Sequence, residues 1–216
     1  MMRIAWAFSL LALTICFDAS AALADTIFND FGSGNSYNTS AGWVVAGTKK
    51  GFQEVAVEFT PAANYYLSQV DVAIGYLGSG DNSIVLSLNS DSGGLPGSVI
   101  GTQTLIGLPS FGASDIDTVT VPDPGPALEV FGGTTYWIVA APYASNSFEA
   151  WDMNSTGVVG GLALNDGSGW YHYSISTTSA FDVLGIPATV PEPTSLLLLG
   201  TGVFGIGLAA WRRRKA

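Results

Sequence analysis

Val70-Asp71-Val72-Ala73-Ile74-Gly75-Tyr76 is the stretch that decides the fold, together with Ile84-Val85-Leu86-Ser87-Leu88 after the turn at 78–82. In both stretches an apolar side chain stands at every second position. A period of two is that of a β-strand with one face in a core, whereas a helix repeats every 3.6 residues. Glycine and asparagine in the turn permit a tight chain reversal. The stretch therefore predicts strands that share one core face.

The same alternation recurs in other parts of the chain. It is carried by Val55, Val57 and Phe59, and later by Tyr136, Ile138 and Ala140. Further clusters of turn residues occupy 92–97, 122–126 and 166–169. Short strands at turn-delimited spacing are typical of an antiparallel sandwich. We expect an all-β, antiparallel β-sandwich or jelly-roll-like single domain over residues 25–187.

The first residues have the pattern of a secretory signal peptide. Arg3 is followed by the apolar run 4–17, and Ala22 and Ala24 form an A-x-A cleavage site. We expect residues 1–24 to direct export through the Sec translocon and to be removed, so that the mature chain begins at Asp25. A buried N-terminal helix is the alternative. Cys16, the only cysteine, lies within this segment, so the mature chain uses no disulfide.

Charge is distributed unevenly along the chain. The net charge is −10, and the only basic residues between the two terminal segments are Lys49 and Lys50. An acidic surface repels phosphate backbones, which makes nucleic acid a poor candidate partner.

The C-terminal segment has the pattern of a membrane anchor. Residues 188–194 form a proline-containing linker, 195–211 an uncharged apolar segment and 212–216 a basic tail. Such an apolar helix would reach about 25 Å, close to the ~30 Å hydrocarbon core, and basic residues stay on the cytoplasmic side. We expect a transmembrane helix with the body outside. The expected anchor residues are Leu196, Leu199, Trp211, Arg212, Arg213 and Arg214.

The segment before this helix carries a short motif, Pro191-Glu192-Pro193. Two prolines around a glutamate favour an extended backbone. The motif, the apolar helix and the terminal arginines together resemble the PEP-CTERM sorting signal. The resemblance implies recognition by an exosortase, a membrane transpeptidase, after a transient stay in the inner membrane. It also implies a destination in the cell envelope, at the cell surface or in the extracellular matrix of a bacterium that makes exopolysaccharide.

The body resembles a choice-of-anchor R type domain. The resemblance is carried by the turn at 94–97 and by the strand that begins Gly133-Thr134-Thr135-Tyr136-Trp137. It implies a surface-displayed sandwich and assigns no catalytic residue.

Residues that could support catalysis are few. His172 is the only histidine, and no Gly-x-Ser-x-Gly motif occurs. One histidine does not build a zinc site. A pair of carboxylates for glycan hydrolysis stays open, because the body is rich in acids. We therefore expect a protein that is not an enzyme, with a carboxylate-dependent glycan hydrolase as an alternative.

Two binding sites are candidates. Asp115, Asp117 and Asp152 lie near turns and offer the oxygen ligands of a structural calcium site, although none has EF-hand spacing and Asp residues also cap turns. Alternation places Trp170 and His172 on one face of a strand, where they could stack on a sugar ring, with Trp43 and Trp151 as companions. The alternative is that these tryptophans pack in the core. The main expectation is a structural or adhesive protein of the exopolysaccharide matrix without a cofactor, and a carbohydrate-binding module is the first alternative.

Overall fold

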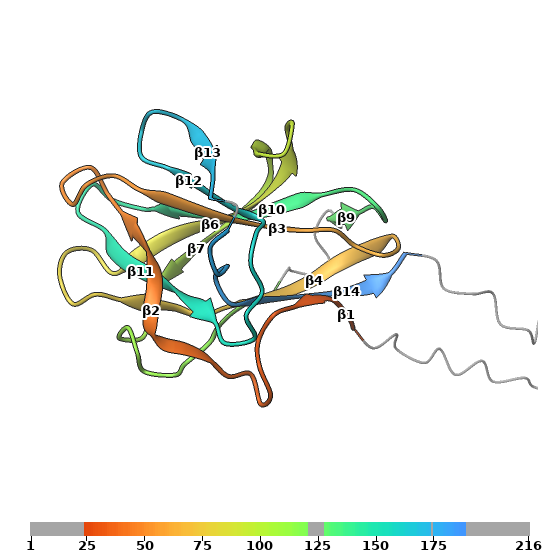
Figure 1. Cartoon of the computed structure of the whole chain (residues 1–216), viewed down its shortest axis with the longest axis horizontal. Coiled ribbons are helices and arrows are strands. Elements are labelled where there is room, and N and C mark those ends of the chain that lie inside the picture. The colour runs from red at the N-terminus through yellow and green to blue at the C-terminus, as the bar shows by residue number, and fades with distance from the viewer. Residues whose placement is uncertain (1–23, 121–127, 174, 189–216) are drawn as a thin grey trace, which may run out of the picture.

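The computed structural model describes residues 24–120, 128–173 and 175–188. In this part of the chain every regular element is a strand, and all pairs of named strands are antiparallel (Figure 1). The prediction of an all-β, antiparallel body is confirmed for the described residues. The predicted span at 195–211 and all but the last residue of the predicted signal peptide lie outside the described residues. Within the described ranges, no helix is long and apolar enough to cross a membrane.

The largest sheet has six strands in the order β13-β12-β3-β10-β6-β7. They are β13 (Trp170–His172), β12 (Leu162–Asn165), β3 (Glu54–Phe59), β10 (Tyr136–Pro142), β6 (Ser83–Asp91) and β7 (Pro96–Ile106). The three central strands, β3, β10 and β6, carry the alternating apolar residues from which strands were predicted. Their side chains supply one wall of the core.

Two smaller sheets supply the rest of the core. A five-stranded sheet has the order β1-β14-β4-β8, with β9 also paired to β4. Its strands are β1 (Asp25–Asn29), β14 (Phe181–Pro187), β4 (Tyr65–Val72), β8 (Asp117–Thr120) and β9 (Glu129–Val130). A three-stranded sheet contains β2 (Tyr37–Ala46), β11 (Phe148–Asn154) and β5 (Ile74–Tyr76).

One apolar core joins the three sheets. Of the predicted core positions, Tyr76 is half-buried and packs against this core, and the others are buried in it: Val55, Val57, Phe59, Val70, Val72, Ile74, Ile84, Leu86, Leu88, Tyr136, Ile138 and Ala140. Trp151 and Phe181 add large rings, with centroids 6.2 Å apart and a T-shaped arrangement. Sheets that meet through their apolar faces in this way are consistent with a β-sandwich.

The single strand predicted around residues 70–76 is two strands, which is a correction. β4 ends at Val72 and belongs to the five-stranded sheet, whereas β5 begins at Ile74 and pairs with β11. Ala73 lies at the corner, where its N–H donates to the Ala180 carbonyl and its own carbonyl accepts from the Asp152 N–H. The alternation continues across the corner because both strands face the same core, so the sequence pattern alone shows no break.

Candidate functional site

An aromatic cluster lies on the outer face of the six-stranded sheet. Trp137 is fully buried there among small residues of β3, β10 and β12, and the half-buried Trp170 and Leu95 pack against the cluster. Trp137 Nε1 donates a 2.9 Å hydrogen bond to Asp91 Oδ1. This bond is the main reason that the pKa of Asp91 lies below its usual value, and the Gly94 N–H also contributes.

The residues predicted to stack on a sugar lie beside this cluster. His172 is exposed, with its ring centroid 6.1 Å from that of Trp137, while one side of Trp170 is used in packing. The prediction that Trp151 accompanies them is wrong, because Trp151 is fully buried in the core. Trp43 is half-buried and forms an edge contact with Tyr173. The rings of Tyr171 and Tyr173 are exposed as well, although alternation places them opposite to Trp170 and His172.

The three predicted calcium ligands all lie near Tyr37. Burial, together with the charges of Asp152, Asp115 and Asp117, raises the pKa of Tyr37 to about 12. Burial also raises the pKa of Asp152 to about 7 and that of Asp117 to about 6. The structure thus brings together acids that are far apart in sequence. Among the described residues, however, no three His, Cys, Asp or Glu side chains are arranged to hold a metal ion, so calcium binding stays a prediction.

Glu149 is a fully buried carboxylate that sequence reasoning missed. It lies in β11, two residues before Trp151, and both of its carboxylate oxygens lack a hydrogen-bond partner. The pKa of Glu149 is raised to about 7, mainly by burial. The nearby N–H groups of Phe148 and Ser83 oppose this rise, and the charge of Asp81 contributes to it. The alternation Glu149-x-Trp151 is a signal that could have found it, because the two side chains share a face.

Further acids are buried where β1 meets β14. Asp30 Oδ1 accepts from the Phe181 N–H at 2.8 Å, and its Oδ2 accepts from the Thr178 hydroxyl at 3.1 Å. Asp182 accepts from Asn29 Nδ2 at 3.3 Å and stands directly opposite Asp71 in the sheet. Both Asp30 and Asp182 are more than nine-tenths buried. Such carboxylates hold strands together and are out of reach of a polysaccharide substrate.

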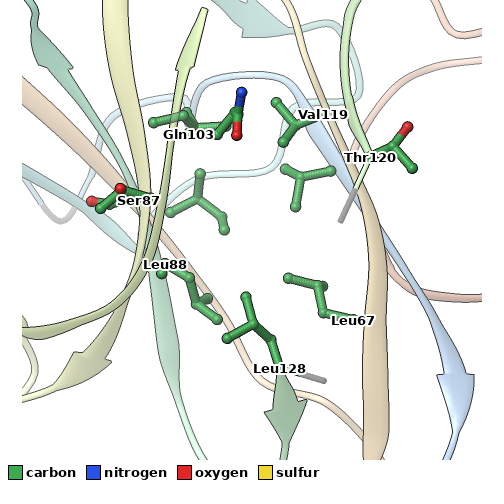
Figure 2. A pocket seen from close by; sticks show the side chains of 12 residues that line it. Leu67, Ser87, Leu88, Gln103, Val119, Thr120 and Leu128 are labelled. Atoms are coloured by element: carbon green, nitrogen blue, oxygen red, sulfur yellow. The ribbon is translucent and has the colours of Figure 1, made fainter. Parts of the chain in front are cut away.

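A cavity of about 90 Å³ lies between the two larger sheets (Figure 2). Its lining is mainly apolar, with Leu67 from β4, Leu88 from β6 and Leu128 before β9 among the residues that surround it in Figure 2. Gln103 of β7 and Thr120 of β8 add polar groups to the lining. The edge strands β7 and β8 thus both contribute to the lining, and they belong to different sheets.

The remaining site is the sorting segment. The family model of the PEP-CTERM protein-sorting motif matches residues 189–215, which confirms the resemblance seen at Pro191-Glu192-Pro193. No curated protein matches the chain. The matched segment begins two residues after β14 ends at Pro187. The motif indicates an exported, envelope-associated protein that an exosortase recognises, while the likeness of the body to a choice-of-anchor R type domain stays a prediction.

The structure places the other terminal residues only in part. Ala24 of the predicted cleavage site is exposed and directly precedes β1. Ala22, the Pro191-Glu192-Pro193 motif and the predicted anchor residues Leu196, Leu199, Trp211, Arg212, Arg213 and Arg214 lie outside the described residues.

Proposed function

We propose that the body is a non-enzymatic, structural or adhesive β-sandwich that the sorting segment delivers to the cell surface or the exopolysaccharide matrix. The observation that carries this proposal is the sorting motif at 189–215, which follows the last strand of the fold almost directly. Export and envelope association follow from the motif, whereas the structural or adhesive role of the body is our proposal.

The way in which β14 is held supports a tethered role. β14 is an interior strand, with β1 on one side and β4 on the other, and it leads into the sorting segment. A pull on the attached end would therefore be resisted by two ladders of backbone hydrogen bonds. The stacked rings of Phe28 and Phe181, with centroids 4.5 Å apart, add packing at the same place.

Burial of the acids favours this role over hydrolysis. A glycosidase needs two carboxyl groups that reach the same glycosidic bond. Asp30, Glu149, Asp152 and Asp182 have raised pKa values through burial, but each is more than nine-tenths buried. Their pKa values are therefore raised because the carboxyl groups are buried in the fold, and not because they line an open cleft for a substrate.

The test is the intact mass and cell fractionation of the protein from its own host. We expect a product that starts at Asp25, ends near Pro191 and carries added mass from the transpeptidation. A product that retains Trp211 and the arginine cluster in the membrane fraction would contradict sorting by an exosortase and leave a simple C-terminal anchor.

A carbohydrate-binding module is the second candidate. The exposed rings of Tyr171 and Tyr173 next to His172 favour it, because aromatic faces stack on sugar rings. Binding on a glycan array that is lost in Tyr171→Ala and Tyr173→Ala would support it. Tyr143→Ala is the matched control, since Tyr143 is an exposed tyrosine of a different loop, after β10. Absence of binding by the well-folded protein would contradict this candidate.

A further inference from the structure

β7 is the exposed edge of the six-stranded sheet. It pairs with β6 on one side, and no described strand pairs with its other side. From Gly101 to Ile106 the pairing with β6 is regular, whereas it is irregular between Pro96 and Val99. Val99, Ile100 and Ile106 of this strand are exposed apolar residues, and Ile106 is 80% exposed. An edge strand of this kind presents a row of unpaired N–H and C=O groups that can template another strand.

The other sheet edges in the described part of the chain are protected. β13 and β5 have three residues each, β8 has four, and β1 is five residues long and irregular between Thr26 and Phe28. β2 is long, but its pairing jumps between Gly42 and Asn38, and the Gln53 backbone exchanges two hydrogen bonds with Ala46 near its end. Short strands and bulges are the usual means of preventing edge pairing. β7 has neither over Gly101–Ile106.

The charge distribution identifies the partner that fits this edge. The protein has a net charge of −10, yet the chain from Ser92 to Ser114 contains no charged residue. Two copies repel each other wherever acidic surfaces meet, and this repulsion is smallest where both surfaces are uncharged. β7 lies entirely within the uncharged stretch. It also lacks the lysine that natural edge strands often carry to prevent pairing.

We propose that β7 is a dimerisation strand that binds β7 of a second copy of this chain. Antiparallel pairing of Gly101–Ile106 with its own copy is isologous, because the same patch serves both partners around a two-fold axis. The two six-stranded sheets become one continuous sheet across the dimer. The pairing also covers the apolar edge beside the cavity, which is lined in part by Gly101, Thr102 and Gln103. Because the dimer closes on itself, it uses up both exposed edges and does not extend into fibres.

Cysteine cross-linking of the exported protein from its own host tests this proposal. Cys16 is the only cysteine of the sequence and lies in the predicted signal peptide, so the exported chain provides a cysteine-free background. Thr102→Cys, Gln103→Cys and Thr104→Cys are then introduced singly, since a two-fold axis near the middle of Gly101–Ile106 brings at least one of them close to its own copy. We expect at least one variant to form a disulfide-linked species of twice the monomer mass on a non-reducing gel. Val159→Cys is the control, because Val159 is an exposed apolar residue away from β7.

A charged variant distinguishes a loss of strand pairing from a loss of folding. Thr102→Lys should abolish the dimer in sedimentation measurements on the native protein, with an unchanged circular dichroism spectrum. Thr118→Lys, the same change at an exposed threonine of the edge strand β8, should leave the dimer intact. Three outcomes would overturn the proposal: a monomer at all concentrations, no cross-link from any β7 cysteine, or equal cross-linking from Val159→Cys.

Discussion

Asp25, the first residue of β1, pairs with Gly185, two residues before the end of β14. The strand at the predicted mature N-terminus therefore lies beside the strand that leads into the sorting segment. With export through the Sec translocon, as the N-terminal pattern predicts, β1 would cross the membrane first and β14 last, and their pairing would close only after the whole body is translocated. The pairing joins elements at the two ends of the fold, and contacts between such distant segments form slowly because they close a long loop.

Packing between β1 and β14 is the first feature that we expect to be measurable. Phe28 is half-buried and stacks on Phe181 with a 4.5 Å centroid separation and an interplanar angle of 22°. Phe28→Ala should lower the free energy of unfolding by about 2–3 kcal/mol, below the range for a fully buried phenylalanine. Urea unfolding measures the change. Phe131→Ala, at a 47% exposed position, is the control and should change the free energy by less than about 0.5 kcal/mol.

Stability should rise as the pH falls from 8 to 5. Burial raises the pKa of six carboxyl groups in the folded protein. The pKa rises to about 6 for Asp30, Asp117 and Asp182 and to about 7 for Glu149 and Asp152, and that of Glu54 lies above its usual value. Their ordinary values are 3.8 for Asp and 4.5 for Glu. Between pH 4 and 7 the folded state therefore holds more protons than the unfolded state, so stability is lost as the pH rises through this range. A melting temperature that is higher at pH 8 than at pH 5 would contradict this.

Glu149 should account for a large share of that pH dependence. A pKa of about 7 in place of 4.5 corresponds to roughly 3 kcal/mol at pH 8, since one pKa unit is about 1.4 kcal/mol. Glu149→Gln keeps the shape and removes the charge, so we expect a free energy of unfolding about 1–3 kcal/mol higher at pH 8 and little change at pH 4. Asp115→Asn, at an exposed carboxylate, is the control. A lower stability of Glu149→Gln at pH 8 would mean that the carboxylate is satisfied by a cation.

The sequence predicts the strands of the core better than their assignment to sheets. Alternation at residues such as Val57, Leu86 and Ile138 depends only on which face meets the core, and the structure buries all of them. The corner at Ala73 does not interrupt the alternation of apolar residues in the sequence, because Val72 and Ile74 on its two sides face the same core. Pairing of β1 with β14 depends on contacts between distant segments, for which a single sequence carries no signal.

The candidate sites were predicted less well than the core strands, because the exposure of their residues depends on contacts with distant segments. Alternation correctly places Trp170 and His172 on one face, but whether that face is covered depends on Trp137 and Leu95 from other segments. The sequence presents Asp117 and Asp152 as acids near turns, whereas the structure places Asp152 in β11, almost fully buried. The sorting motif was found because its three parts are contiguous in sequence and need no tertiary contact.

Trp170 should behave as a packing residue. Because its ring covers part of the Trp137 cluster, Trp170→Ala should lower the free energy of unfolding by about 1–3 kcal/mol, less than for a fully buried tryptophan. Tyr171→Ala, one residue later at a 39% exposed position, should change it by less than about 1 kcal/mol. Thermal or urea unfolding of both variants gives the comparison. Equal stability of Trp170→Ala and the unmodified protein would favour a free ring that is available to a ligand.

The sorting motif should fail when its backbone preference is removed. Two prolines favour an extended chain before the apolar segment, whereas alanines allow a helix to continue through it. With Pro191 and Pro193 both replaced by alanine, we expect the chain to stay in the membrane fraction with the mass of the uncleaved tail. Intact mass and fractionation from the native host measure this, and Ser168→Ala in the exposed β12–β13 turn should be processed normally. Normal processing of the double variant would show that the prolines are dispensable and that recognition depends on Glu192 or on the apolar segment.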